Sequence, residues 1–328
     1  MSRISIDIPL DQPGRYLGRY HIPFSDNSQP YGHFGPIAVL ANGSGPTLLL
    51  TGGTHGDEYP GPVAIMRLIQ DLDLAAIQGR LILIPALNAP AVRAAMRCSP
   101  LDGGNMNRAF PGAVDGGPTA MIADWLMTKI LPLADAAIDF HAGGRVTDYA
   151  PLAMVNGGPR SRYGDNLALA RAFGTGLIWR LGALNDSRSV NGAAEQAGVP
   201  MMACELGGLG DANPAMIRIA HDGALNVMRH LGILQDGRPV PSIAQRMVES
   251  VDRANSHIAP HGGLFDPLVE IGTDVQAGDL AGWVRDPFEL ARAPTEIRFA
   301  RSGHLAIRGT RGLVSAGDLL FGLVTDIA

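Results

Sequence analysis

His55 and Glu58 stand three residues apart in the segment T-G-G-T-H-G-D-E-Y-P-G, which covers residues 51–61. An imidazole and a carboxylate are both common metal ligands. The glycines around them allow the backbone to turn sharply, so both side chains can point toward one place. The segment therefore predicts one half of a metal-binding site.

The sequence on either side predicts that this segment is a turn from a strand to a helix. The apolar run P-T-L-L-L of residues 46–50 is typical of a buried strand in a parallel sheet. After the turn, Ile65, Leu68, Ile69 and Leu72 recur at helical spacing on one face.

Two further reactive groups directly follow predicted strands. His141 comes after the strand of residues 136–140, and Glu205 comes after the strand of residues 199–204. In an open α/β sheet, ligands bind at the carboxyl ends of the strands. We therefore expect these two groups to meet the first pair at one edge of the sheet.

Two imidazoles and one carboxylate are the ligand set of a catalytic zinc ion, which keeps a fourth position for water. The predicted ligands of one Zn²⁺ are therefore His55, Glu58 and His141, and a hydroxide would form on the metal near neutral pH. Asp139 lies on the same strand face as His141 and is expected to accept the other N–H of its imidazole. Glu205 remains as the general base.

Each of these signals has a plainer interpretation when it is taken alone. An H-x-x-E pair is common by chance, His141 could be a buried core histidine, and Glu205 could cap a helix or pair with an arginine. The joint placement at strand ends, with glycines on nearly every flank, favours the metal site. His261 stays undecided, and Cys204 is expected to point the opposite way, into the core.

The whole chain predicts an α/β fold, in which helices flank a mixed, mostly parallel sheet, followed by a small C-terminal all-β domain. The first domain would cover residues 1–238 and the second residues 239–328, with a linker at 235–245. Residues 1–45 predict edge strands, and the long loop 91–117 is expected to carry function. The other expected strands are 46–51, 80–88, 136–140, 176–181 and 199–204, and the expected helices are 62–74, 119–130, 165–173 and 214–231.

A short pattern recurs within the second domain. V-Q-A-G-D at residues 275–279 returns as V-S-A-G-D at residues 314–318, an echo typical of hammerhead-like β modules that carry biotin or lipoate. No lysine occurs from residue 246 onwards to attach such a group. A carrier role is therefore excluded.

Composition narrows the class of protein. With 46% hydrophobic and 17% charged residues, the 328-residue chain resembles an ordinary soluble globular protein. The net charge of -5 and the scattered basic residues argue against a nucleic-acid partner. No membrane span or signal peptide is apparent, and Cys98 and Cys204 form no disulfide framework, so a cytoplasmic location is expected. Neither a G-x-S-x-G motif nor a phosphate-binding loop occurs.

Four motifs in fixed order carry a resemblance that covers essentially the whole chain. They are G-G-T-H-G-D-E (52–58), N-x-N-R-x-F-P-G (105–112), D-x-H-x-G-G (139–144) and C-E-L-G-G (204–208). Together they are similar to the succinylglutamate desuccinylase and aspartoacylase family, relatives of the zinc carboxypeptidases. Within the family, residues 99–112 are most similar to the branch of N-acetyl-diaminobutyrate deacetylases.

This resemblance implies a role for each matching residue. His55, Glu58 and His141 would bind zinc, and Glu205 would be the base that later protonates the leaving amine. In the long loop, Arg97 would polarise the scissile carbonyl and hold the oxyanion, while Asn107 and Arg108 would hold the substrate carboxylate. The C-terminal β domain would cap the site and limit it to small substrates. Two features depart from the aspartoacylases: the gap between Arg97 and Arg108 is longer, and Asn105 stands where that branch often has Asp.

The predicted activity is zinc-dependent hydrolysis of a small N-acyl amino acid, with acetyl or succinyl as the acyl group. Two carboxylates would cancel the zinc charge and two arginines would leave the site positive, which favours an anionic substrate. The alternatives are a zinc carboxypeptidase acting on short peptides and a non-catalytic anion-binding relative. The oligomeric state stays open, with a homo-oligomer as one option.

Overall fold

The computed structural model describes residues 2–27, 29–158, 161–182, 185–250 and 255–327. Its helices are α1 (Pro60–Asp71), α2 (Ala89–Ala94), α3 (Pro118–Trp125), α4 (Tyr163–Phe173), α5 (Val190–Ala197) and α6 (Pro214–His230), with a π-helical turn at Leu126–Ile130 and 3-10 turns at Leu74–Ala76, Met106–Arg108 and Leu131–Leu133. Its strands are β1 (Ser5–Ile6), β2 (Gly14–Ile22), β3 (His33–Asn42), β4 (Thr47–Gly52), β5 (Gly79–Ile84), β6 (Ala136–His141), β7 (Thr147–Tyr149), β8 (Leu152–Asn156), β9 (Leu177–Leu181), β10 (Met201–Glu205), β11 (Arg246–Glu249), β12 (Ser256–Ile258), β13 (Gly263–Pro267), β14 (Asp274–Val275), β15 (Leu280–Arg285), β16 (Thr295–Arg298), β17 (Gly303–Gly309), β18 (Leu313–Val314) and β19 (Leu319–Asp326).

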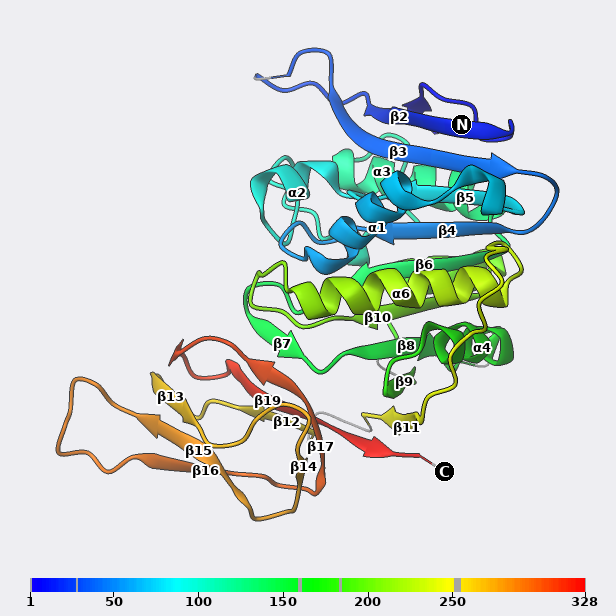
Figure 1. Cartoon of the computed structure of the whole chain (residues 1–328). Coiled ribbons are helices and arrows are strands. Elements are labelled where there is room, and N and C mark those ends of the chain that lie inside the picture. The colour runs from blue at the N-terminus through cyan, green and yellow to red at the C-terminus, as the bar shows by residue number, and fades with distance from the viewer. Residues whose placement is uncertain (1, 28, 159–160, 183–184, 251–254, 328) are drawn as a thin grey trace.

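One large sheet organises the molecule. Its strands follow the order β1-β2-β3-β5-β4-β6-β10-β8-β9-β11-β19-β17-β14, with β12 beside β19 and β7 beside β17. The central strands β5, β4, β6 and β10 are parallel, and β10 pairs antiparallel with β8. Figure 1 shows the N-terminal strands at one end of this stack and the C-terminal strands at the other. The predicted α/β architecture with a mixed sheet is confirmed.

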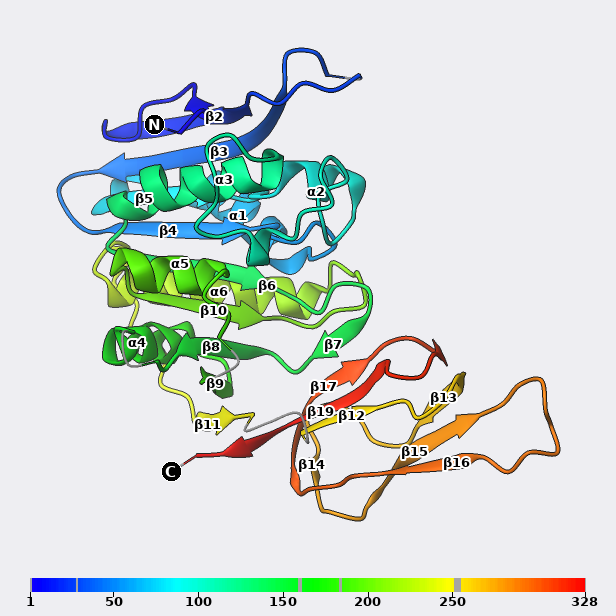
Figure 2. The same cartoon turned by 180° about the vertical axis from the view of Figure 1, so that it is seen from behind.

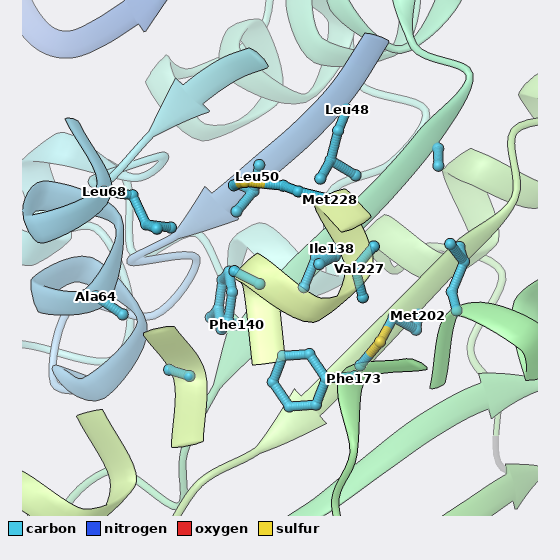
Figure 3. Close-up of a cluster of buried hydrophobic side chains, with 14 of the residues drawn as sticks. Leu48, Leu50, Ala64, Leu68, Ile138, Phe140, Phe173, Met202, Val227 and Met228 are labelled. Atoms are coloured by element: carbon cyan, nitrogen blue, oxygen red, sulfur yellow. The ribbon is translucent and has the colours of Figure 1, made fainter. Parts of the chain in front are cut away.

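Helices cover both faces of the central strands. One face packs against α1, α4 and α6 (Figure 1), and the opposite face packs against α3 and α5 (Figure 2). Successive strand residues alternate between the two cores: Leu48 and Leu50 belong to the first, and Leu49 belongs to the second. This is why β4 reads as an unbroken apolar run. Figure 3 shows the first core, where Phe173 of α4 and Val227 of α6 meet the strand side chains.

The C-terminal region is rich in strands, as predicted. Strands β16-β15-β13-β18 form a separate antiparallel sheet. The large sheet also enters this region, because β11 pairs with β9 and β19 pairs with β11. In addition, β17 pairs with β7 and places Ile307 opposite Tyr149. The division at residues 238 and 239 stays a prediction.

The repeated V-x-A-G-D pattern forms two equivalent turns. Gly278 and Gly317 both have φ near 90°, a conformation that favours glycine. Asp279 and Asp318 each accept a 2.8 Å hydrogen bond from the backbone N–H three residues earlier. The echo in the sequence is therefore explained by turn geometry.

Several elements near the cavity described below differ from the predictions. Helix α2 lies partly within the expected loop 91–117, because Pro90 stands in the first turn of a helix there. The strand expected to reach residue 88 ends earlier, as β5 stops at Ile84. Helix α5 and strands β7 and β8 were not predicted. The helix expected over 119–130 changes to a π-helical turn after Trp125. Within the described residues, no helix combines the length and apolar character needed to cross a bilayer.

Candidate metal centre and active site

The turn between β4 and α1 carries His55 and Glu58 into the interior. Gly53 has φ of 67°, which favours glycine. A Cβ atom at Gly56 would lie 2.1 Å from the backbone of Ala91, so the turn packs directly on α2. The resulting close packing leaves the His55 and Glu58 side chains only 2% and 3% exposed.

His141 joins this pair from the end of β6. One oxygen of Glu58, Oε1, lies 2.8 Å from Nδ1 of His55, and the other, Oε2, lies 3.0 Å from Nδ1 of His141. One ligand atom from each residue can be chosen so that all three lie within 4.8 Å of one another. Residues separated by more than 80 positions thus form one buried cluster of metal-ligating groups.

An oxygen atom lies opposite the other nitrogen of each ring. Nε2 of His141 lies 2.7 Å from Oδ2 of Asp139, and Oδ1 of Asp139 accepts hydrogen bonds from the hydroxyls of Thr51 and Thr54. The predicted contact between Asp139 and His141 is therefore present.

Asn105 provides the acceptor for His55. Its Oδ1 accepts a hydrogen bond from the Asn107 N–H at 2.9 Å and lies 3.1 Å from Nε2 of His55. An oxygen at this position requires Nε2 to carry the proton. If a metal displaced the proton on Nδ1, the lone pair of His55 would lie on the side that faces Glu58.

This donor set fits a zinc ion. Two imidazoles present Nδ1 toward a shared carboxylate, while acceptors fix their Nε2 atoms, which is how protein zinc sites orient histidine ligands. Burial alone would raise the pKa of Glu58, but His55 and His141 more than offset this and hold that pKa well below its usual range. Glu58 is therefore an anion, as a metal ligand must be.

Glu205 lies beside this cluster and has an unused oxygen. In the register of β10 and β6 it is the direct partner of His141, so both side chains lie on the same face of the sheet. Within the described residues, its buried Oε2 has no hydrogen-bond partner. Burial, followed by the charge of Glu58, raises the pKa of Glu205 to about 8. Cys204 faces the other way, into the first core, as expected.

The predicted substrate-binding residues surround a cavity of about 240 Å³ above these groups. Arg97 donates from Nη1 to Oε1 of Glu58 at 3.1 Å. Arg108 pairs with Asp186 at 3.1 Å, and Oδ1 of Asn107 accepts a hydrogen bond from Val190 N at 2.9 Å. The cavity is also lined by His55, His141 and Glu205, so the structure brings the reactive groups and these three residues to one space.

Comparison with known proteins identifies the architecture. Residues 44–231 match the succinylglutamate desuccinylase/aspartoacylase catalytic domain. The chain is 35% identical over 323 residues to the N-alpha-acetyl-L-2,4-diaminobutyric acid deacetylase of Halomonas elongata, covering 97% of this chain and 94% of that protein. The chain belongs to the succinylglutamate desuccinylase/aspartoacylase family. The resemblance seen in the sequence is confirmed.

Solved structures of family members share the same fold over the full length. The product-bound ectoine utilization protein EutE (DoeB) from Ruegeria pomeroyi has a TM-score of 0.93 at 35% identity, covering 99% of both chains. A succinylglutamate desuccinylase from Silicibacter sp. TM1040 also has a TM-score of 0.93, at 36% identity, covering 100% of this chain and 99% of that one.

Sequence reasoning missed part of the cavity wall of this family member. Tyr149 on β7 lines the cavity, and burial together with the charges of Glu205 and Glu58 raises the pKa of its hydroxyl well above its usual value. Trp179 on β9 adds an apolar surface. No sequence signal indicates either residue, because β7 is too short for a strand pattern and the apolar run of residues 176–181 predicts a strand without a functional side chain.

The segment of residues 185–191 was also missed. It contributes Asp186, Ser189 and Asn191 to the cavity wall. The sequence signal for this segment is Ser189, since serine is a preferred residue at the start of a helix. In the structure Ser189 caps α5 by accepting a hydrogen bond from Gly192 N. The described residues that line the cavity all lie between His55 and Glu205, so capping by the C-terminal region stays a prediction.

Proposed function

We propose that this family member is a zinc-dependent amidohydrolase that releases an acyl group from a small N-acyl amino acid. The observation that carries the proposal is the buried His55–Glu58–His141 cluster with Glu205 beside it. The raised pKa of Glu205 and its unused oxygen suit a group that exchanges protons. The deacetylase from Halomonas elongata, similar over almost the full length, favours acetyl as the acyl group and 2,4-diaminobutyrate as the amino acid.

The proposed ligands are His55, Glu58 and His141. A zinc ion held there would polarise the substrate carbonyl and lower the pKa of a bound water. Glu205 would take the proton from the attacking water on its free Oε2 and pass it to the amide nitrogen as the C–N bond breaks. The pKa of about 8 in the metal-free protein suits the second step, in which Glu205 holds a proton, and a bound cation would lower that pKa so that the first step begins from the carboxylate.

Two arginines would stabilise negative charge at different places. Arg97 already contacts Glu58 through Nη1, so it lies close enough to the cluster to hold the oxyanion that develops on the carbonyl. Arg108 and Asn107 would bind the carboxylate of the amino acid. The cavity of about 240 Å³ suits a small substrate more than an extended peptide.

The test is hydrolysis by zinc-loaded protein of Nα-acetyl-L-2,4-diaminobutyrate, N-acetyl-aspartate, N-succinyl-glutamate and a short peptide. We expect at least one acylated amino acid to be cleaved much faster than the peptide, with activity lost on chelation and restored by zinc. Preference for the peptide would favour a carboxypeptidase. Stoichiometric zinc binding without turnover of any substrate would favour a binding protein.

A further inference from the structure

The segment of residues 185–191 lines the cavity and contacts the two residues proposed to bind the substrate carboxylate. Asp186 contacts Arg108, and Val190, the first residue of α5, contacts Asn107. Neither contact was anticipated from the sequence, and neither belongs to the proposed metal site. These contacts determine which atoms of Asn107 and Arg108 remain for a ligand.

The side-chain oxygen of Asn107 is already used. Oδ1 accepts the 2.9 Å hydrogen bond from Val190 N, one of the N–H groups that lack a partner within the helix at the start of α5. This contact fixes the amide orientation, because the N–H of Val190 requires an oxygen opposite it. Nδ2 of Asn107 makes no hydrogen bond within the described residues and carries two donors for a carboxylate.

The guanidinium of Arg108 makes contacts through two of its three nitrogens. Nε lies 3.1 Å from Oδ2 of Asp186, and Nη1 donates to the backbone oxygen of Asn107 at 2.6 Å. Its Nη2 makes no hydrogen bond in the described part of the chain. A flexible arginine that is 47% exposed is thereby restricted to an orientation with one donor group left over.

Asp186 itself has little capacity for a positively charged ligand. Its Oδ1 accepts hydrogen bonds from N and Nε of Arg188 at 2.9 and 3.0 Å. Its Oδ2 accepts from Nη2 of Arg188 at 2.8 Å and also faces Arg108. Two guanidinium ions thus surround one carboxylate, and the group as a whole is positive. This environment favours a bound carboxylate over a bound ammonium group.

We propose that Asp186 is a positioning residue that orients Arg108 so that its Nη2 faces the substrate carboxylate, alongside Nδ2 of Asn107. The inference rests on the proposed function, and it explains what orients the carboxylate-binding groups of this chain. It also excludes Asp186 as the receptor for a free amino group on the substrate. Selectivity for carboxylated substrates therefore depends on a residue outside the four family motifs.

The test compares Asp186→Asn with the wild-type enzyme on two substrates. For Nα-acetyl-L-2,4-diaminobutyrate we expect KM to rise at least about tenfold with kcat nearly unchanged, since a charge-assisted contact to the substrate carboxylate is weakened. For N-acetyl-1,3-diaminopropane, which lacks the carboxylate, kcat/KM should not change. Asp186→Glu should recover part of the lost affinity. Equal losses on both substrates, or no loss on either, would overturn the inference.

A second comparison separates positioning of Arg108 from direct binding of an amine. In an Arg108→Gln background, Asp186→Asn should cause no additional loss, because its effect passes through Arg108. Asp186→Asn could instead lower affinity further in the Arg108→Gln background, with Nα-acetyl-L-2,4-diaminobutyrate but not with N-acetyl-2-aminobutyrate, which lacks the free amine. That result would identify Asp186 as an ammonium receptor and contradict the inference. Asp165→Asn is the matched control, since Asp165 pairs with Arg162 at 2.8 Å outside the cavity.

Binding measurements keep this inference separate from the proposed function. If zinc-loaded wild-type protein cleaves no acylated amino acid, the proposed function fails. Calorimetry can then compare 2,4-diaminobutyrate with 1,3-diaminopropane on the wild-type and Asp186→Asn proteins. A preference for the carboxylated ligand that is reduced at least about tenfold by the substitution supports the positioning role, and an unchanged preference overturns it. Zinc content and thermal unfolding should match the wild type.

Discussion

Glu205 and His141 lie directly opposite each other on the parallel strands β10 and β6. Side chains at paired positions of neighbouring strands point to the same face of a sheet. The register of two buried strands therefore places a carboxylate with an unused oxygen next to an imidazole of the candidate metal site. Any shift of this register by one residue would turn Glu205 into the opposite core.

Replacing Glu205 tests the general base. We expect Glu205→Gln to keep stoichiometric zinc and to lose at least about a hundredfold in kcat, since general acid–base catalysis contributes on the order of 10²–10⁴ in rate. Glu289→Gln, at an exposed position between β15 and β16, is the control. Near-normal turnover in the Glu205 variant would remove this residue from the mechanism.

Removing one imidazole tests the metal site. The His141→Ala protein should fail to retain zinc after dialysis at neutral pH, because two ligands remain where three are needed to hold a catalytic zinc. Elemental analysis provides the measurement. His230→Ala, which changes an exposed residue at the end of α6, should retain the metal. Full zinc occupancy without His141 would place the metal elsewhere.

Asp139 should act on zinc affinity through His141. Asp139→Asn keeps the shape of the side chain but removes the charge that lies 2.7 Å from Nε2 of His141. The expected result is a loss of about 10–100-fold in zinc affinity, measured by competition with a chelator. Asp115→Asn, in a surface pair that is 88% exposed on the aspartate side, is the control. An unchanged affinity would show that Asp139 is structural.

Zinc binding should release protons near pH 7. The pKa of Glu205 is raised to about 8 by burial and by the charge of Glu58, so the metal-free protein holds this proton at pH 7, and a bound cation would lower the pKa and displace it. Release by Glu205 should diminish as the pH rises through about 8. Calorimetry in two buffers of different ionisation enthalpy measures the release, and Glu205→Gln should reduce it. Heats that do not depend on the buffer would contradict this expectation.

Packing at Gly56 should limit what the turn tolerates. Gly56→Ala places a Cβ atom 2.1 Å from the backbone of Ala91, and we expect it to lower the free energy of unfolding by about 1–3 kcal/mol, as overpacking does, and to weaken zinc binding. Gly164→Ala in α4 is the matched control, because its Cβ would meet no atom within 4 Å. That change should be neutral or stabilising by about 0.5–1 kcal/mol. Chemical denaturation compares the two variants, and equal stabilities would refute the packing argument.

Much of the candidate metal centre could be anticipated because parallel strands deliver their ends to one edge of a sheet. The apolar runs before His55, His141 and Glu205 identified three such ends, and the alternation of side chains placed Asp139 on the face of His141. These inferences depend on local patterns that survive in a single sequence. The roles of the individual residues in catalysis remain predictions.

The remaining cavity wall could not be anticipated because it depends on distant contacts. Tyr149 is placed by β7, a strand of three residues that pairs with β17 more than 150 positions later. Asp186 lies shortly before the eight-residue α5, which is too short for a clear helical period. Its importance is apparent only once Arg108 lies beside it. Position in these segments is determined by tertiary packing instead of local sequence pattern.

The continuity of the large sheet through β9, β11 and β19 has a consequence for dividing the protein into parts. A fragment that stops at residue 238 would leave one side of β9 without its neighbour and uncover Trp179, which packs in the same apolar cluster as Val248 and Val324. Bare backbone N–H and C=O groups along such a border recruit strands from other molecules. Such a fragment is therefore expected to self-associate when it is produced alone.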